Sequence, residues 1–353
     1  MTHAISTQYI ALKNKIPLGL LLTLIITAQT LFTPQAMAAE KSSADGSGNS
    51  SEAITILTTL PVTYFLSSAL VADTNIQVKN LPKRGRRLNG QENYFTSKKA
   101  KKLATTFNSA SAVVTIGKLW RDDPLFTAAR SANIRIVEID ATKPWSSTLE
   151  GISVAMTPAQ DTPWASSDDE SKHGTKSAEN TPSVFFWLSL MNSARSAEII
   201  AEDLMRLVPG EATTIKTNLT KLHSKLMELQ RRNELAMLNA ADITVFSLAP
   251  ELVYLTSEQN LFVDGSFYKQ DIEWTSTDTE ALEKHLKENK IGVVLHKWEP
   301  AEPILNAIKA AGAKLVVIET IDAGIVKKGS MLPDSYLMLM EENLKNLRAA
   351  FIN

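Results

Sequence analysis

One long amphipathic stretch, residues 211–239, constrains the fold of this chain more than any other segment. Its apolar residues recur at three- and four-residue spacing: Ile215, Leu219, Leu222, Leu226 and Leu229. This spacing predicts a single long helix with one apolar face, about 40 Å in length. Short apolar runs are frequent on both sides of it, so we expect the helix to connect two separately folded parts.

Strands and helices alternate on both sides of the long helix. The predicted strands are short apolar runs rich in β-branched residues, at 54–58, 76–81, 112–117, 134–139, 243–246, 261–263, 291–295 and 315–318. The predicted helices cover 64–71, 97–108, 125–131, 192–207, 278–288, 301–311 and 334–351. This alternation is typical of an α/β fold with mainly parallel sheets. We therefore predict two α/β lobes, at 53–209 and 240–353, joined by a linking helix at 210–239.

The first 38 residues have the pattern of a cleavable signal peptide. Two lysines precede an apolar run at 16–32, and Ala36-Met37-Ala38 is typical of a cleavage site. The apolar run is shorter than the ~20 residues that a membrane-spanning helix needs. Residues 39–52 are small and polar, which predicts a disordered leader. We expect a secreted, periplasmic protein.

Composition excludes several classes of function. The chain has 0 cysteines, so it can form neither a disulfide nor the lipid-bearing cysteine of a lipoprotein. Its 38 acidic side chains balance 37 basic ones, which gives no reason to expect a nucleic-acid partner. The sequence contains no Gly-x-Ser-x-Gly elbow, no glycine-rich phosphate loop and no His-Glu-x-x-His helix. We do not expect an enzyme.

Polar residues at strand ends are the first candidates for a binding site. His296 and Asp322 each follow a predicted strand, and ligands of parallel α/β sheets bind at the carboxyl ends of strands. His223 and His285 lie on predicted helices among Lys and Glu, where we expect solvent-facing side chains. A polar insert at 156–183, which contains His173, interrupts the alternation and predicts a mobile surface loop.

Several short sequences resemble one family of transport proteins. They are Asn80-Leu81-Pro82, Trp187-Leu188-Ser189, Val245-Phe246, Tyr254, Val316 to Ile318, and Asp322 followed by Gly324. Together they look like the periplasmic solute-binding proteins of zinc and manganese ABC transporters, and the resemblance covers essentially the whole mature chain. It implies two α/β lobes joined by a rigid helix, and an inner-membrane ABC permease as partner. It also implies a zinc or manganese ion as cargo, held between the lobes by three histidines and one carboxylate.

The family's ligand positions carry different side chains here. By resemblance, Gln91, Phe185 and Ser247 stand where the family has histidines, and Asp322 stands at the carboxylate position. Zinc and manganese sites need several nitrogen or oxygen ligands that converge on the ion. Asp322 is thus the one candidate metal ligand, and the sequence predicts an altered cargo or an altered mode of binding.

Two alternatives remain open. The basic run Lys83-Arg84-Gly85-Arg86-Arg87 leads toward the first ligand position, and Arg86 and Arg87 could bind carboxylate or phosphate oxygens of an anionic metal chelate. The chain could instead be an accessory protein that keeps the scaffold and binds a protein partner rather than a small solute.

Overall fold

The first half of the chain forms a parallel sheet. The computed structural model describes residues 54–164 and 181–352. The strands are β1 (Ile54–Thr58), β2 (Ile76–Asn80), β3 (Ala112–Thr115) and β4 (Val137–Asp140). They pair in the order β2-β1-β3-β4, all parallel. Ile56 and Leu57 of β1 enter different apolar clusters, as period-two alternation requires, so the sheet is covered on both faces.

Short helices cover this first sheet. They are α1 (Pro61–Leu70), α2 (Gln91–Thr96), α3 (Ala104–Asn108) and α4 (Pro124–Ala132). Both α1 and α4 begin at a proline, whose missing N–H would have no partner in the first turn. The Asp123 side chain caps α4 by accepting from the Leu125 N–H. We call residues 54–164 and 181–207 the N-terminal lobe.

The second half repeats the topology of the first. Its strands are β5 (Thr244–Ser247), β6 (Phe262–Ser266), β7 (Val293–His296) and β8 (Lys314–Val317). They pair in the parallel order β6-β5-β7-β8. The helices are α7 (Val253–Glu258), α8 (Ser276–Glu288), α9 (Glu302–Ala310) and α10 (Ser335–Phe351). A small hairpin, β9 (Val326–Lys327) and β10 (Ser330–Met331), precedes α10. We call residues 243–352 the C-terminal lobe.

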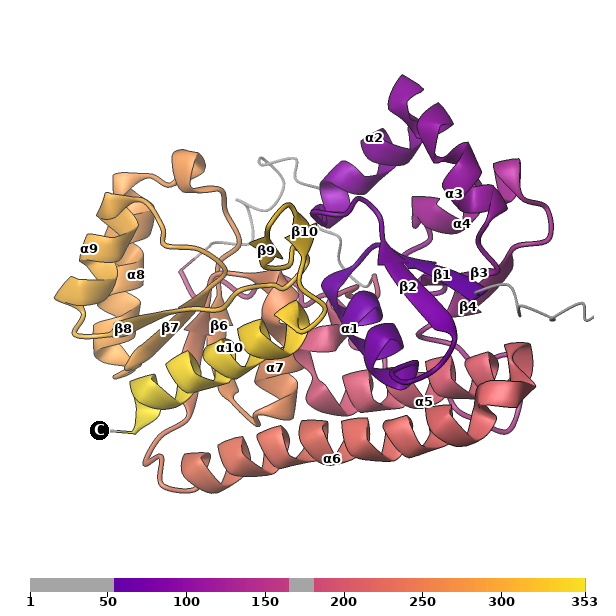
Figure 1. The fold of residues 1–353 in the computed structure, drawn as a ribbon. Coiled ribbons are helices and arrows are strands. Elements are labelled where there is room, and N and C mark those ends of the chain that lie inside the picture. The colour runs from indigo at the N-terminus through magenta and orange to yellow at the C-terminus, as the bar shows by residue number, and fades with distance from the viewer. Residues whose placement is uncertain (1–53, 165–180, 353) are drawn as a thin grey trace, which may run out of the picture. The chain divides into compact units, whose positions relative to one another are not determined.

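Two long helices lie between these sheets in the sequence. Helix α5 (Leu190–Leu207) leads into α6 (Ala212–Met237), and α6 packs against α5, α1 and α10, an arrangement that Figure 1 shows. The stripe predicted for α6 is buried at Ile215, Leu222, Leu226 and Leu229. Two parallel sheets and one long helix confirm the predicted α/β class. The exact domain boundaries at 209 and 239 stay predictions.

Several predicted elements differ from the structure. The single helix predicted at 97–108 is wrong, because Lys98–Leu103 forms a 3₁₀ helix before α3. Four lysines in that run leave no apolar stripe to hold a longer α-helix. Strand β4 begins three residues later than predicted, since its first pairing partner is Ala112. The prediction also missed α7 and the β9–β10 hairpin.

The described ends of the polar insert predicted at 156–183 are held by contacts with the rest of the chain. Met156 pairs with Pro182 in an antiparallel bridge. The Asp161 carbonyl accepts from the N–H of Ser266 on the edge strand β6 (2.8 Å), and Trp164 stacks on Phe246. The edge strand is therefore capped by a segment from the N-terminal half of the chain.

Some predictions concern residues outside the described ranges. These are the signal peptide at 1–38, the leader at 39–52, and the central part of the insert with His173. Within residues 54–164 and 181–352, no helix combines the length and apolar character needed to cross a membrane.

Candidate functional site at the junction of the lobes

Asp322 lies in the loop after β8 and is buried, with an exposed fraction of 7%. Its carboxylate accepts hydrogen bonds from the Arg87 guanidinium (3.0 Å), the Leu88 N–H (3.4 Å) and the Thr320 hydroxyl (3.1 Å). The preceding residue, Ile321, has φ of 57° although it is β-branched and fully buried. Such a backbone costs roughly 1–3 kcal/mol, which indicates that the surrounding contacts impose the shape of this loop.

Arg87 is the N-terminal lobe's contribution to this junction. Its side chain is 56% exposed, and its second terminal nitrogen lies 3.7 Å from Glu319 Oε1. The guanidinium therefore bridges two carboxylates of the loop after β8. The Arg87 side chain is thus paired with the Asp322 carboxylate, which by family resemblance would be a metal ligand.

The loop that carries Arg87 is shaped by turns and by the β9–β10 hairpin. Gly85 donates to the Pro82 carbonyl (2.8 Å) and has φ of +70°. A Cβ at Gly85 would lie 3.0 Å from the Met331 sulfur, so glycine suits both the conformation and the close approach. The Met331 N–H donates to the Lys83 carbonyl (2.6 Å), which ties the two loops together. Arg86 turns elsewhere: it donates to the Gly90 carbonyl (3.3 Å).

Gln91, at a predicted ligand position, is fully buried at the start of α2. Its amide nitrogen donates to the carbonyls of Arg86 (3.1 Å) and Thr59 (3.4 Å). Its Oε1 atom has no hydrogen-bond partner among the described residues. Gln91 thus supports the Arg87 loop from within and offers one free neutral acceptor.

The other two predicted ligand positions hold side chains that contact nearby residues of the chain. Phe185 packs against a neighbouring ring, and Ser247 forms a hydrogen bond to nearby backbone. The Phe185 ring is half-buried and lies 5.4 Å from the Trp187 ring, centroid to centroid. Ser247 is buried at the end of β5, where its hydroxyl donates to the Ala249 carbonyl (3.2 Å). A phenyl ring has no coordinating atom, and this hydroxyl shapes a backbone turn.

His296 lies at the carboxyl end of β7, as predicted, and its exposed fraction is 3%. Its ring packs 4.7 Å from Trp298, and Nε2 lies 3.9 Å from Asp271 Oδ1. Nδ1 has no partner among the described residues. Burial lowers the pKa of His296 to about 4, so the imidazole is neutral at pH 7. These contacts all lie within the C-terminal lobe.

The structure therefore brings together only part of the predicted set. Asp322 and Arg87 meet directly, and Gln91 supports the same loop through the Arg86 carbonyl. Sequence reasoning missed Glu319 and Thr320, which a search of the same strand end could have found. Across residues 54–164 and 181–352, no three His, Cys, Asp or Glu side chains are grouped so that they could hold a metal ion.

The prediction for His285 on α8 is wrong. Its side chain is 15% exposed, with Nε2 2.7 Å from Asp264 Oδ2. The ring packs against Trp164 and Phe246, so the described end of the insert covers it. His223 is partly exposed, and its Nε2 contacts the Ala194 carbonyl.

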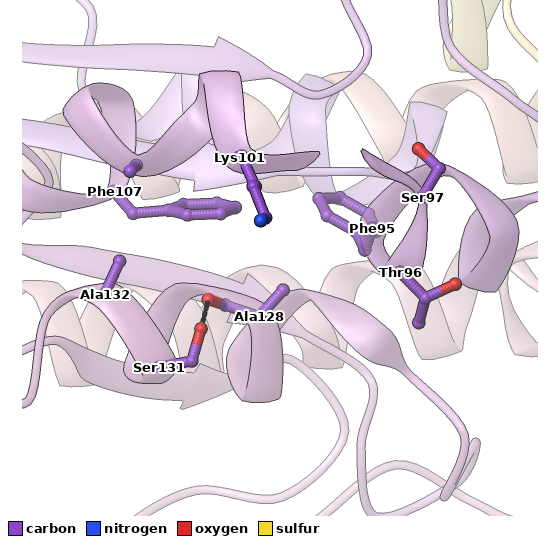
Figure 2. A pocket seen from close by; sticks show the side chains of 9 residues that line it. Phe95, Thr96, Ser97, Lys101, Phe107, Ala128, Ser131 and Ala132 are labelled. Carbon is purple, nitrogen blue, oxygen red and sulfur yellow. Dashed lines mark hydrogen bonds between the residues drawn. The ribbon is translucent and has the colours of Figure 1, made fainter. Parts of the chain in front are cut away.

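A separate groove of about 350 Å³ lies among α2, α3 and α4. Figure 2 shows Phe95 and Phe107 facing it, with Lys101 between them. None of the predicted site residues lines this groove.

Comparison with known proteins now identifies the class of this chain. The profile of the family described as "Zinc-uptake complex component A periplasmic" matches residues 56–350. The chain belongs to that family, which confirms the resemblance found in the sequence.

Individual relatives are distant. The zinc-binding protein AdcA of Streptococcus pyogenes serotype M18 is 24% identical over 182 residues, which are 51% of this chain and 35% of that protein. The match thus spans about a third of that curated relative's length.

Solved structures share the fold. An FpvC mutant from Pseudomonas aeruginosa has a TM-score of 0.65 at 19% identity, covering 84% of this chain and 99% of its own. The Zn(II)-bound ZnuA-like domain of Streptococcus pneumoniae AdcA has a TM-score of 0.60 at 18% identity, covering 85% and 99% respectively. At these identities the likeness establishes the fold alone.

Proposed function

We propose that this chain is the periplasmic solute-binding component of an ABC transporter of the zinc-uptake family, and not an enzyme. It would capture its cargo between the two lobes and deliver it to an inner-membrane permease. Family membership over residues 56–350 and the pair of parallel sheets joined by α6 support this function. The signal-peptide pattern at 1–38 supports a periplasmic location.

The pairing of Arg87 with Asp322 carries the second part of the proposal, an altered mode of binding. A zinc site needs about four nitrogen, sulfur or oxygen ligands at roughly 2.0–2.3 Å. The positions equivalent to the family ligands instead offer an amide, a phenyl ring and a hydroxyl bonded to backbone, while the carboxylate faces a guanidinium. We infer that a bare zinc ion is not held here by a histidine cage.

An anionic metal chelate fits the donors at the junction. The Arg87 guanidinium, the Leu88 N–H and the Thr320 hydroxyl all donate to one carboxylate. Donors arranged around a carboxylate can donate in the same way to the carboxylate or phosphate oxygens of a ligand. Such a ligand would replace the Asp322 carboxylate as the hydrogen-bond partner of the Arg87 guanidinium.

A second candidate function, an accessory protein that binds a protein partner, is favoured by one observation. The lobes are joined directly by a buried hydrogen bond from Trp187 Nε1 to the Thr320 carbonyl (2.7 Å). A scaffold joined in this way could present a fixed surface to a partner and carry no small solute.

Native mass spectrometry of the protein purified from periplasm separates these candidates. The solute-binding proposal predicts a mass above that of the mature chain, which returns to the mature mass on mild unfolding. An accessory role predicts the bare mature mass together with a co-purifying protein. The bare mass with neither would contradict both candidates.

A further inference from the structure

The loop after β8 presents two carboxylates to one arginine. Asp322 Oδ1 and Glu319 Oε1 lie 3.0 Å and 3.7 Å from the two terminal nitrogens of Arg87. We propose that Arg87 determines the cargo specificity of the junction. Its guanidinium occupies the place that a divalent cation would take between Asp322 and Glu319, so the site rejects bare divalent cations. This inference rests on the proposed function.

The ion pair differs from an ordinary surface salt bridge because of its setting. Its partners are 235 residues apart in the chain, and the Asp322 side chain is only 10% exposed. The Leu88 N–H and the Thr320 hydroxyl add further donors to the same carboxylate. The carboxylate is therefore largely shielded from water, whereas the guanidinium that pairs with it is more than half exposed.

Replacing the guanidinium by a neutral group would leave two acidic side chains without their cation. Carboxylate, carbonyl and water oxygens are the ligands that suit Mn²⁺. Asp322 and Glu319 supply carboxylate oxygens in one loop, and the Thr320 hydroxyl lies between them in the chain. An Arg87→Gln variant should therefore gain a weak Mn²⁺ site that the native protein lacks.

Arg84 provides a matched control. It belongs to the same basic loop, its side chain is exposed, and it forms no ion pair among the described residues. Arg84→Gln removes the same charge from the same loop and leaves the Asp322 contact intact. Any effect of net charge alone should therefore appear equally in both variants.

The test is a calorimetric titration of Mn²⁺ into the mature chain of wild type, Arg87→Gln, Arg84→Gln and the double variant Arg87→Gln with Asp322→Asn. We expect Arg87→Gln to bind Mn²⁺ at least about tenfold more tightly than wild type. Arg84→Gln should match wild type, and the double variant should lose the gain. Unchanged Mn²⁺ binding in Arg87→Gln, or a gain that survives Asp322→Asn, would overturn the proposal.

Two further measurements keep the result decisive. Arg87→Lys retains the charge without the fork, so it should reject Mn²⁺ as wild type does, even if the glutamine variant folds poorly. Hydrogen exchange should be faster at 86–90 and 319–322 in Arg87→Gln, and Mn²⁺ should slow it again. Mass spectrometry of the periplasmic protein tests the transport role separately, because it measures native cargo and not Mn²⁺ selectivity.

Discussion

Thr320 and Asp322 are two residues apart, yet they join the lobes by different physical means. The Thr320 carbonyl accepts from Trp187, whose side chain is fully buried. The Asp322 carboxylate accepts from Arg87, whose side chain is more than half exposed. The first link lies in the main apolar core, and the second lies where water and ions can compete. We infer that the Trp187 link stabilises the fold and that the Arg87 link can exchange with a ligand.

Removal of the buried link should have the largest effect. Trp187→Ala eliminates a fully buried indole and its hydrogen bond, so we expect a loss of about 3–5 kcal/mol in the free energy of unfolding. Urea denaturation measures this loss. Trp298→Ala, at a side chain that is 43% exposed, should cost only about 1 kcal/mol. Equal losses in the two variants would mean that the burial of Trp187 and its hydrogen bond add nothing to stability.

A pH series extends the comparison to groups buried one in each lobe. Burial lowers the pKa of His296 to about 4, below the ~6.5 of an unfolded chain, so its contribution to stability is lost as the pH falls from ~6.5 to ~4. Burial raises the pKa of Asp123 to about 6, so its contribution is lost as the pH rises from ~4 to ~6. Each pKa shift changes the free energy of unfolding by roughly 3 kcal/mol across its own pH window.

These opposite slopes can be separated by substitution. We compare the thermal stability of His296→Gln with that of wild type at pH 4.5 and at pH 7. The stability of the variant relative to wild type should be higher at pH 4.5 than at pH 7. For Asp123→Asn, the stability relative to wild type should be higher at pH 7 than at pH 4.5. An unchanged pH profile in His296→Gln would mean that this imidazole is not kept neutral by burial.

Tyr336 tests how far the buried link depends on its polar neighbours. Its ring is fully buried, and its hydroxyl donates to the Trp187 carbonyl (2.9 Å) and lies 2.7 Å from the Ser193 hydroxyl. Tyr336→Phe should cost about 1–3 kcal/mol, because it leaves buried acceptors without a donor. Tyr64→Phe is the control, since the Tyr64 hydroxyl makes no hydrogen bond among the described residues; its effect on urea denaturation should stay below about 0.5 kcal/mol.

The exchangeable link should contribute least to stability. Arg87→Gln should lower the free energy of unfolding by about 1 kcal/mol or less, because solvent screens a half-exposed guanidinium. The loss should shrink further in ~1 M salt, where the screening length is about 3 Å. The cost of Trp187→Ala should persist in that salt. If the loss in the free energy of unfolding of Arg87→Gln did not depend on salt, the Arg87 link would behave like the buried Trp187 link, and the distinction between the two would be wrong.

Much of the fold could be predicted from local patterns. The apolar stripe of α6 and the β-branched strands are set by neighbouring residues, so their periods are visible in the sequence. The boundaries of β4 and the 3₁₀ helix at Lys98–Leu103 were missed because pairing partners and the lack of an apolar face decided them. His285 was mispredicted because Trp164, 121 positions earlier, covers it.

The candidate site could be predicted only in its parts. Asp322 was recognised by its place after a strand, and Arg87 by its basic loop. Their hydrogen bond was not predicted, because no local pattern connects residues 235 positions apart. Whether Gln91, Phe185, Ser247 and His296 take part in binding stays a prediction.

The most direct test of the central claim is a calorimetric titration of zinc into the mature protein after chelator treatment. The pairing of Arg87 with Asp322 predicts no stoichiometric zinc binding at submicromolar affinity in wild type. Stoichiometric submicromolar binding that disappears in Asp322→Asn would contradict the account, because it would mean that zinc displaces Arg87 and uses this carboxylate as the family resemblance implies.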